Sequence, residues 1–513
     1  MQLRVRLLPL EAEKPIVVLN NDDADEIDVK PLERVKIRYN RHNFVAIVNT
    51  TEKMVKQGEI GLYEDIVDEL KIRSGQILKV DAADPPESLS YIKKKMEGMV
   101  LTKHEVDKII DDTVGGNLSD IELTSFVTSL YNHGMTMGEI ANLSMAMART
   151  GDMLRIKNKE IYDKHSIGGV PGDKTSIIVV PTVAAGGLTI PKTSSRAITS
   201  PAGTADRFEC IAPVELGLEE IKRVVEKTGA CLVWGGAVDL APADDMFIRI
   251  EYPLSIDPFL LPSVMSKKKA VGAKYLVIDI PTGDEAKINT KEDFENLADK
   301  FITLGKRLHI KVNAISTYAD QPLGYAIGPA LEAREALKTI MTGKGPADLV
   351  DKATTLAGVL FSFSGDNDGK KTAFGMLHSK KTYRKLQEII EAQGGDPKIR
   401  PEDIPVGKNK AALLSKTKGK VLWISNKVVD MVARGAGAPK YKGAGILLNK
   451  KIGDKVKKGE KILEIYAENS TRLNQAMKIA GKSEIMKIGK ESTMALDRFP
   501  SGGERERTFI LER

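Results

Sequence analysis

Cysteine is scarce in this sequence. Cys210 and Cys231 are the only two among 513 residues. They are too few for a framework of disulfide bonds, and they lack the paired spacing of a zinc site. We therefore expect reduced thiols and no bound metal ion.

Long apolar runs are also missing. The amino end has no basic stretch followed by a long apolar segment, and no uninterrupted apolar run is long enough to span a bilayer. We expect a cytoplasmic protein that does not associate with membranes.

A large excess of charge of one sign is absent as well. The 77 basic and 70 acidic residues give a net charge of +7, which is spread through the chain. This balance suits a small anionic substrate and does not require nucleic acid as a partner. The chain is longer than one hydrophobic core usually organises, and its 42% hydrophobic share is typical of globular proteins, so we expect several domains.

The first segment has the pattern of β-strands. Short β-branched and aromatic runs at residues 16–19, 35–39 and 44–48 are separated by Asn, Asp and Gly clusters. We expect a small β-rich domain over residues 1–84. It ends at Asp84-Pro85-Pro86-Glu87, whose prolines indicate a linker.

The period of the hydrophobic pattern changes after this linker. Three capping-box signatures predict three helix starts, at Thr102 with Glu105, Ser119 with Glu122, and Thr136 with Glu139. Apolar residues then recur three and four positions apart, so one face of each helix can be buried. We expect an all-helical lobe.

From about residue 155, short apolar strands alternate with longer helical segments. Residues 275–280 and 312–315 have the composition of buried strands. After about residue 415, glycine-punctuated β segments follow. The whole pattern predicts a multidomain α/β protein: a small β-rich amino-terminal domain, an all-helical lobe, a large α/β lobe with a mostly parallel sheet, and a β-rich carboxyl-terminal portion.

The first chemical motif spans residues 163–176, with the sequence DKHSIGGVPGDKTS. Its glycines allow backbone amides to approach a ligand, and a helical run through Ala185 would direct its positive end to the same place. Lys164 adds a charge, while Ser166 and Ser176 add neutral donors. A plain glycine-rich turn is the alternative, but the flanking Lys, His and Ser residues favour an anion site.

A nucleotide-binding P-loop is the nearest rival interpretation of this motif. Asp173 stands immediately before Lys174, where a P-loop has glycine, and its carboxylate would repel phosphates. We therefore discount an ATPase.

A second motif spans residues 194–209, SSRAITSPAGTADRFE, in which many hydroxyl groups surround Arg196. Taken alone, this segment could be a solvated loop with local hydrogen bonds. Beside the first motif, it indicates a second anion-binding wall.

The two motifs together resemble those of the thymidine and pyrimidine nucleoside phosphorylase family. Residues 164–176 match its Lys-His-Ser, Gly-Gly and Gly-Asp loop, with Pro171 inserted. The second motif matches at Ser194, Arg196, Gly203, Thr204, Asp206 and Glu209, and a third stretch matches at Gln321, Pro322, Leu323, Gly324, Gly328, Leu331, Glu332 and Glu335. The resemblance covers essentially everything after residue 88.

The departures from the family pattern concern the sugar pocket. Family glycines and a histidine are replaced by Ser195, Ala197, Thr199 and Ser200. New hydroxyl groups beside Arg196 are what a 5′-phosphate would require. These residues and the extra amino-terminal domain are similar to the archaeal-type branch that converts a nucleoside 5′-monophosphate and phosphate into free base and ribose 1,5-bisphosphate. AMP is the expected substrate, with CMP and UMP as further candidates and a nucleoside as the alternative.

The resemblance also implies the domain organisation. Residues 88–154 with 243–268 would form the helical lobe on the base side, and 155–242 with 269–414 the α/β lobe on the phosphate side. Residues 415–513 would complete the α/β lobe, and residues 1–84 would support assembly. The family is also oligomeric, so we expect a homo-oligomer with a dimeric core.

The same resemblance implies roles for individual residues. Asp257 matches the proton donor to the leaving base, although an Asp-Pro turn is its plain alternative. The implied nucleotide contacts are Gly169, Ser195, Arg196, Ala197, Ile198, Thr199, Ser200, Thr204, Ser263 and Lys287. The implied phosphate contacts are Lys164, Ser166, Ser176 and Ser194. Phosphate is a co-substrate, and no cofactor is implied.

A carrier role is the distant alternative. Gly453, Asp454 and Gly459, with Lys478 in an Ala-Met-Lys-Ile stretch, are similar to parts of a biotin or lipoyl domain. The modified lysine of such domains lies on the hairpin directly after the Gly-Asp strands, whereas Lys478 comes later, in a segment that we predict to be helical. We expect it to be unmodified.

Overall fold

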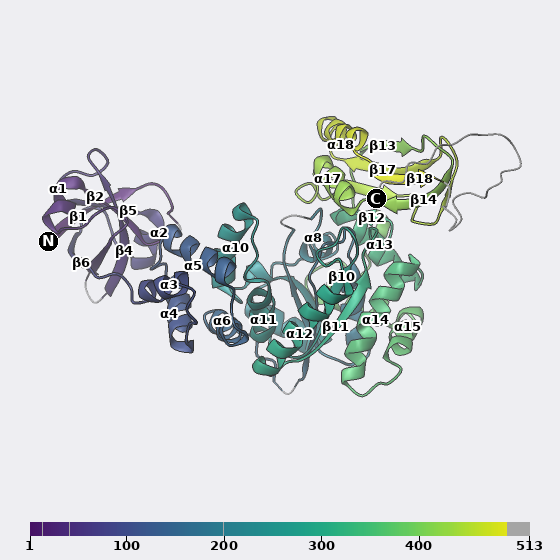
Figure 1. The fold of residues 1–513 in the computed structure, drawn as a ribbon, viewed down its shortest axis with the longest axis horizontal. Coiled ribbons are helices and arrows are strands. Elements are labelled where there is room, and N and C mark those ends of the chain that lie inside the picture. The colour runs from purple at the N-terminus through teal and green to yellow at the C-terminus, as the bar shows by residue number, and fades with distance from the viewer. Residues whose placement is uncertain (13, 40–41, 158, 198–199, 490–513) are drawn as a thin grey trace, which may run out of the picture.

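The computed structural model describes residues 1–12, 14–39, 42–157, 159–197 and 200–489. The molecule is elongated, with an amino-terminal β barrel at one end, then a helical bundle, an α/β lobe and a carboxyl-terminal β-rich region (Figure 1). The predicted multidomain α/β class is confirmed.

The amino-terminal region is a closed β barrel. Its strands are β1 (Gln2–Leu8), β2 (Ile16–Asn20), β3 (Arg34–Tyr39), β4 (His42–Thr51), β5 (Glu59–Tyr63) and β6 (Ile77–Ala83), with helices α1 (Asn21–Glu26) and α2 (Glu64–Leu70). The order around the barrel is β1-β5-β2-β4-β3-β6. Leu3 and Val5 alternate with exposed residues along β1 and enter the barrel core. The three predicted strand runs are confirmed, and closure of the sheet removes its exposed edges.

A buried arginine joins the barrel to the helical bundle. Arg34 is 4% exposed, and its Nη2 donates to Glu122 Oε2 at 2.5 Å and to the carbonyl oxygen of Asn117 at 2.7 Å. Glu122 also belongs to the capping box at the start of the next helix. The contact between the barrel and the bundle therefore uses the Glu122 carboxylate, which the capping box already holds in place.

The helical bundle begins directly after the linker. Its helices are α3 (Ser88–Met96), α4 (Lys103–Val114), α5 (Asp120–His133), α6 (Met137–Arg149), α10 (Pro242–Leu254) and α11 (Leu260–Ala270). All three predicted capping boxes are confirmed. The aromatic rings of Phe247 and Phe259 stack at 4.2 Å and join Phe126 in the core of the bundle. The chain thus returns to the bundle after passing through part of the α/β lobe.

The α/β lobe contains parallel strands. They are β7 (Ile161–Ser166), β8 (Ile190–Ser194), β9 (Ala230–Trp234), β10 (Ala273–Thr282) and β11 (Lys311–Tyr318). Strands β11, β10 and β7 form one sheet, and the pair β8–β9 joins it through a parallel bridge between Ile161 and Thr189. The runs predicted at 275–280 and 312–315 lie in β10 and β11. The parallel order brings the carboxyl ends of all these strands to one side.

Helices surround these strands. They are α7 (Thr175–Ala185), α8 (Thr204–Phe208), α9 (Leu218–Thr228), α12 (Lys291–Leu308), α13 (Pro329–Thr342), α14 (Ala347–Phe363), α15 (Gly369–His378) and α16 (Lys381–Ala392), with short 3₁₀ helices η1 (Gly235–Ala237) and η2 (Pro401–Asp403). Helix α7 follows the first chemical motif, as predicted through Ala185.

The carboxyl-terminal region combines two small sheets with two helices. The sheets are β12 (Ala326–Ile327), β15 (Gly445–Leu448), β17 (Lys461–Ala467) and β13 (Asn409–Leu414), and then β16 (Lys455–Val456), β14 (Gly419–Ile424) and β18 (Met486–Gly489). The helices are α17 (Asn426–Ala436) and α18 (Ser470–Lys482). Lys478 lies on α18, so its predicted helical setting is confirmed. Residues 490–513 of the predicted carboxyl-terminal portion lie outside the described residues.

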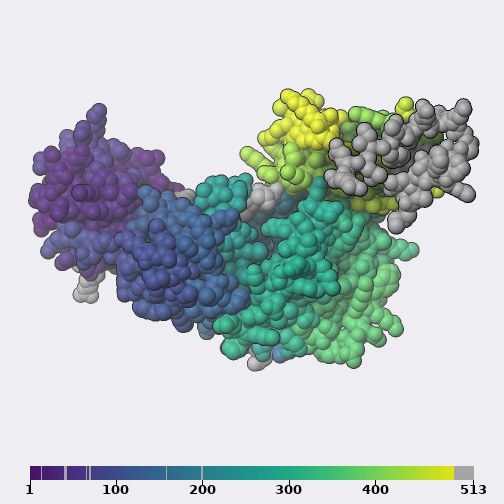
Figure 2. Space-filling view, in the orientation of Figure 1, coloured from purple at the N-terminus to yellow at the C-terminus, as the bar shows by residue number. Residues whose placement is uncertain are grey.

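The space-filling view shows a hollow between the helical bundle and the carboxyl-terminal region, above the α/β lobe (Figure 2). Both chemical motifs belong to the α/β lobe, and α10 rises beside the hollow in the same orientation (Figure 1). Across the described residues, no helix has both the length and the apolar character needed to cross a membrane.

Candidate active site

Two of the predicted phosphate contacts lie where parallel strands end. Ser166 is the last residue of β7, and Ser194 is the last residue of β8. Gly168 and Gly169 follow β7 with φ of +77° and +97°, a conformation that glycine adopts without strain. The carboxyl ends of parallel strands are the usual ligand-binding edge of an α/β sheet. The first motif therefore opens onto that edge.

The structure brings Lys164 and Ser176 together at the start of α7. The Lys164 ammonium donates to Thr175 Oγ1 at 2.9 Å and to Ser176 Oγ at 3.5 Å. Thr175 and Ser176 are the first residues of α7, so the positive end of the helix lies at the same place. A buried ammonium, two hydroxyl groups and a helix start thus meet at one place, the cradle, and such a group of donors can bind an anion.

Next to this cradle, Lys352 forms ion pairs with Asp173 and Asp279. Lys352 Nζ on α14 is 3.4 Å from Asp173 Oδ2 and 2.9 Å from Asp279 Oδ2. Burial alone would raise the pKa of Asp173, but Lys164 and Lys352 hold it well below the usual range. The negative charge of Asp173 is therefore balanced by the two lysines, so it need not repel an anion bound nearby. Sequence reasoning missed Lys352 because 179 positions separate it from Asp173.

A second buried charge cluster links the two lobes. Lys268 on α11 pairs with Asp163 Oδ2 on β7 at 2.6 Å, and Lys192 Nζ lies 3.8 Å from Asp163 Oδ1. Burial, with Lys268 nearby, lowers the pKa of Lys192 to about 7. Burial and the surrounding lysines also hold the pKa of His165 well below its usual value, so its ring is neutral. Two lysines, Lys192 and Lys268, therefore share the single carboxylate of Asp163 in this cluster.

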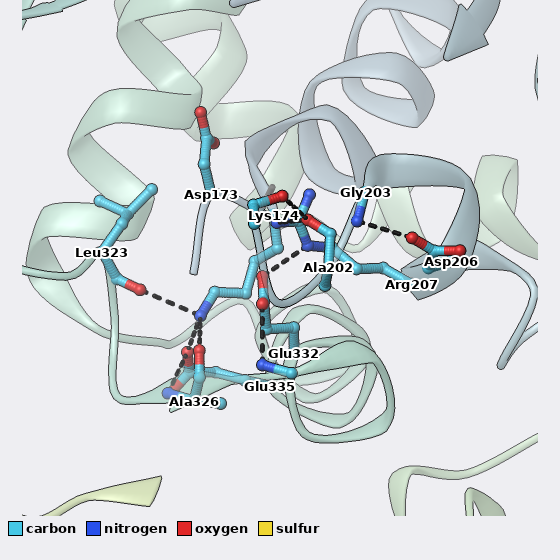
Figure 3. Close-up of polar contacts among 12 residues, drawn as sticks. Asp173, Lys174, Ala202, Gly203, Asp206, Arg207, Leu323, Ala326, Glu332 and Glu335 are labelled. Carbon is cyan, nitrogen blue, oxygen red and sulfur yellow. Dashed lines mark hydrogen bonds and ion pairs between the residues drawn. The ribbon is translucent and has the colours of Figure 1, made fainter. Parts of the chain in front are cut away.

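Lys174, the lysine that a P-loop interpretation would direct to phosphate, points away from the cradle. Its ammonium donates to the carbonyl oxygens of Leu323 and Ala326 at 3.0 and 2.8 Å and to Glu335 Oε2 at 2.5 Å. The Asp173 side chain extends in another direction (Figure 3). Lys174 therefore fastens the motif to α13 and to the segment before it, which supports discounting a P-loop.

Helix α13 supports the second motif. Arg207 Nε donates to Glu332 Oε2 at 2.5 Å, and Arg207 Nη2 donates to the carbonyl oxygen of Ala202 at 2.7 Å (Figure 3). Asp206 Oδ2 accepts from the backbone amides of Gly203 and Ala197, at 2.8 and 2.7 Å. Glu332 and Glu335 of the third family-like stretch thus act as supports for the two loops.

Arg196 is held by carboxylates. Its guanidinium donates to both oxygens of Glu209, to Glu215 Oε1 at 2.7 Å and to Asp206 Oδ1 at 3.3 Å. It also lies 4.8 Å from the centre of the Trp234 ring. Both terminal nitrogens of Arg196 therefore donate hydrogen bonds to carboxylates, and these bonds stabilise the loop.

The other predicted nucleotide contacts of this loop are more accessible. Ser195 is exposed, Ala197 and Ser200 are half-buried, and Thr204 is the first residue of α8. The Ser200 hydroxyl donates to the carbonyl oxygen of Ala202 at 3.2 Å. Ile198 and Thr199 lie outside the described residues.

Asp257 and Lys287 come from different lobes, and the charge of Lys287 acts on the Asp257 carboxyl group. Asp257 lies in the turn between α10 and α11, and Lys287 follows β10. A side chain at Gly169 would approach the Lys287 backbone nitrogen within 3.3 Å, so Lys287 packs on the first motif. Asp257 keeps contact with solvent, yet desolvation raises its pKa; the Lys287 charge opposes this shift and Asp244 adds to it.

Ser263 and Lys267 share one buried partner. The Ser263 hydroxyl donates to Asp244 Oδ2 at 2.8 Å, and Lys267 Nζ lies 2.6 Å from the same oxygen. Among the described residues, the other Asp244 oxygen is buried without a hydrogen-bond partner. Sequence reasoning missed Asp244, whose carboxylate holds the side chains of Ser263 and Lys267 together. The described residues also contain no cluster of three or more His, Cys, Asp or Glu arranged to hold a metal ion.

Three family models match the chain. Residues 89–151 match the glycosyl transferase family helical bundle domain, and residues 158–383 match the glycosyl transferase family a/b domain. Residues 421–485 match the pyrimidine nucleoside phosphorylase C-terminal domain. The matches cover the helical bundle, the α/β lobe and the carboxyl-terminal region.

Relatives match over nearly the whole length. AMP phosphorylase from Thermofilum pendens is 46% identical over 515 residues, with 100% of both chains covered. AMP phosphorylase from Thermococcus kodakarensis is 51% identical over 496 residues, covering 95% of this chain and 98% of the relative. AMP phosphorylase from Methanocaldococcus jannaschii is 46% identical over 484 residues, covering 93% and 96%.

A solved structure supports the fold alone. The crystal structure of anthranilate phosphoribosyltransferase from Thermus thermophilus has a TM-score of 0.51 and 20% sequence identity, and the match covers 59% of this chain and 98% of that one.

Proposed function

The chain belongs to the AMP phosphorylase family, and on that premise we propose that its site splits AMP with inorganic phosphate into adenine and ribose 1,5-bisphosphate. The enzyme is a pentosyltransferase: the glycosidic C–N bond breaks, and the anomeric carbon forms a new bond to a phosphate oxygen. CMP and UMP are further candidate substrates, because nothing in the loop chemistry separates one base from another.

The attacking phosphate would bind in the cradle at the start of α7. Lys164 supplies a positive charge, and Ser166, Ser176 and Ser194 supply hydroxyl groups. The reaction passes through a transition state with oxocarbenium character, so a dianion held against the anomeric carbon stabilises the developing positive charge. Lys352 and Asp279 keep the cradle's charges balanced before substrate arrives.

Asp257 would donate the proton that the leaving base needs. Adenine leaves poorly as an anion, and a carboxylic acid near a ring nitrogen lowers that barrier. Desolvation raises the pKa of Asp257, which increases the share of the acid form. The proton passes from the carboxyl group to the base, and solvent at the exposed Asp257 restores it.

The second motif would hold the nucleotide. Gly169, Lys287, Ser263, Thr204 and residues 195–200 are the proposed contacts. Because Arg196 is bound by Glu209 and Glu215, the loop would offer its hydroxyl groups and backbone amides to the 5′-phosphate. Arg196 would then contribute mainly through its backbone and its charge.

The electrostatic interaction of Asp257 with Lys287, which packs on Gly169, is the observation that carries this proposal. It supports the proposal because it relates the proposed proton donor, on the helical bundle, to proposed nucleotide contacts of the α/β lobe. A thymidine or pyrimidine nucleoside phosphorylase is the less favoured alternative, since the hydroxyl-rich loop is matched to a phosphate that nucleosides lack. A carrier or structural role is less favoured still, because Lys478 is on a helix.

Three further properties belong to this proposal. The enzyme would work as a homo-oligomer with a dimeric core and the amino-terminal barrel as an assembly domain. It would act in the cytoplasm, which suits its two free cysteines. It would use phosphate as a co-substrate and no cofactor, which the chelator control below tests for metal ions.

The test is phosphate-dependent release of base from AMP, CMP, UMP, adenosine and thymidine, measured in parallel by chromatography with a no-phosphate control and a chelator control. Release from monophosphates, unchanged by the chelator, supports the proposal. Release from nucleosides alone would instead support the nucleoside phosphorylase. No release from any of the five would contradict both.

A further inference from the structure

Glu251 makes hydrogen bonds to both ends of the turn that carries Asp257. Helix α10 ends at Leu254, and Ser255 takes a left-handed conformation with φ of 55°. The backbone amide of Ile256 then donates to the carbonyl oxygen of Glu251 at 3.2 Å. This bond sets the start of the turn.

The Glu251 side chain reaches the other end of the same turn. Its Oε1 accepts from the backbone amide of Phe259 at 3.1 Å. Glu251 thus contacts the residue just before Asp257 and the residue two positions after it. Phe259 is fully buried and stacks on Phe247, so the far end of the turn is anchored in the bundle core. Glu251 itself is only 7% exposed.

We propose that Glu251 is a positioning residue for the proton donor, because it clasps the Asp257 turn at both ends and presents the Asp257 carboxyl group to the nucleotide. This inference rests on the proposed function, and specifically on the role of Asp257. It assigns to Glu251 no direct contact with substrate.

The electrostatics of Glu251 favour its neutral carboxyl group below about pH 7. Burial raises its pKa to about 7; the Phe259 amide opposes the shift, and the charges of Asp257 and Asp244 add to it. Asp244 is itself paired with Lys267 on α11. A neutral Glu251 accepts the Phe259 hydrogen bond without placing another negative charge beside Asp257.

Three substitutions separate positioning from acid chemistry. Glu251→Gln keeps the acceptor oxygen and the reach but has no proton to titrate. Glu251→Asp keeps the acid but is one methylene too short to reach Phe259. Glu251→Leu removes the acceptor. We expect Glu251→Gln to stay within a few-fold of the wild-type kcat for AMP, while Glu251→Asp and Glu251→Leu lose on the order of 10²-fold, as small misplacements of catalytic groups do. KM for phosphate should be unchanged in all three.

The control is Glu105→Leu on α4. Glu105 also accepts a backbone hydrogen bond, from Thr102 at 2.7 Å, but at a helix start of the same bundle. We expect a lower melting temperature with wild-type kcat.

The outcomes distinguish the possible failures. If Glu251→Asp keeps more activity than Glu251→Gln, acid chemistry and not position is the role of Glu251. Wild-type kcat in both Glu251→Asp and Glu251→Leu also overturns the inference, as does unfolding of Glu251→Gln. If Glu251→Leu alone unfolds, the comparison of kcat between Glu251→Gln and Glu251→Asp still tests the inference. Full activity of Asp257→Asn in the same assay would instead overturn the proposed role of Asp257.

Discussion

The guanidinium of Arg196 donates hydrogen bonds to both carboxylate oxygens of Glu209, at 2.7 and 2.8 Å. Arg196 and its neighbours hold the pKa of Glu209 at about 2, so the pair is charged across the physiological range. Lys442 from the carboxyl-terminal region also contacts Glu209. The proposed nucleotide loop is therefore held by Glu209, which Lys442 also contacts, before any substrate binds.

Weakening this brace should impair nucleotide binding. We expect Glu209→Gln to raise KM for AMP by roughly three- to tenfold, because the loop loses a charge-assisted bidentate contact, while KM for phosphate stays constant. Steady-state kinetics with each substrate varied would measure both, and Glu219→Gln on the exposed face of α9 is the matched control. A lower KM for AMP would mean that Arg196 leaves Glu209 and binds the 5′-phosphate itself.

Removing the proton donor should stop turnover and spare binding. We expect Asp257→Asn to lower kcat for AMP by about 10² to 10⁴-fold, because the amide cannot give a proton to the departing base. Titration calorimetry should find AMP affinity within a few-fold of wild type, since Asn keeps the size and a hydrogen-bonding group. Loss of AMP binding in a folded variant would contradict the assigned role.

Elements set by local chemistry could be predicted from the sequence. The capping boxes at Thr102, Ser119 and Thr136 each use residues three positions apart, and all three occur. The predicted strands of the barrel are also present, but the pairing of β1 with β6 that closes it joins residues nearly 80 positions apart. No local pattern specifies that pairing.

In the candidate site as well, contacts between residues close in the sequence could be predicted and contacts between distant residues could not. Lys164 and Ser176 stand in one motif, and the structure brings them to 3.5 Å. Lys352 and Lys268 had no such signal, because their aspartate partners lie 179 and 105 positions away. The one sequence feature that marks Lys352 is its helical spacing from Leu349 and Leu356, three positions before it and four after it, because a charge on an apolar helix face requires a partner.

Lys352 offers a test of this buried charge balance. We expect Lys352→Met to lower the free energy of unfolding by about 3 to 5 kcal/mol, because Asp173 and Asp279 lose a shared buried counter-charge. KM for phosphate should rise roughly tenfold, since the two carboxylates then repel the incoming anion. Chemical denaturation and kinetics at varied phosphate would measure these effects. Lys370→Met, which breaks an exposed pair with Asp351, is the control. A stability loss with unchanged KM would make Lys352 purely structural.

The raised pKa of Glu251 should appear as a pH-dependent stability. The folded protein shifts this pKa from 4.5 to about 7, mainly through burial. Below pH 4.5 the carboxyl group is protonated in both the folded and the unfolded chain, so it adds no pH-dependent term there. Between pH 4.5 and about 7 the unfolded chain loses the proton first, so the fold is progressively destabilised relative to a neutral side chain.

Glu251→Gln has no such titration. The shift corresponds to at most about 3.4 kcal/mol, and screening by solvent reduces the expected effect to between about 1 and 2 kcal/mol. We therefore expect the free energy of unfolding of Glu251→Gln, minus that of the wild type, to increase by this amount from pH 4.5 to pH 8 and then to level off. Denaturant titrations at four or five pH values would measure the difference, in which groups common to both proteins cancel. A flat difference would mean that Glu251 ionises in the folded protein as it does in water, and the neutral clasp on the Asp257 turn would then be wrong.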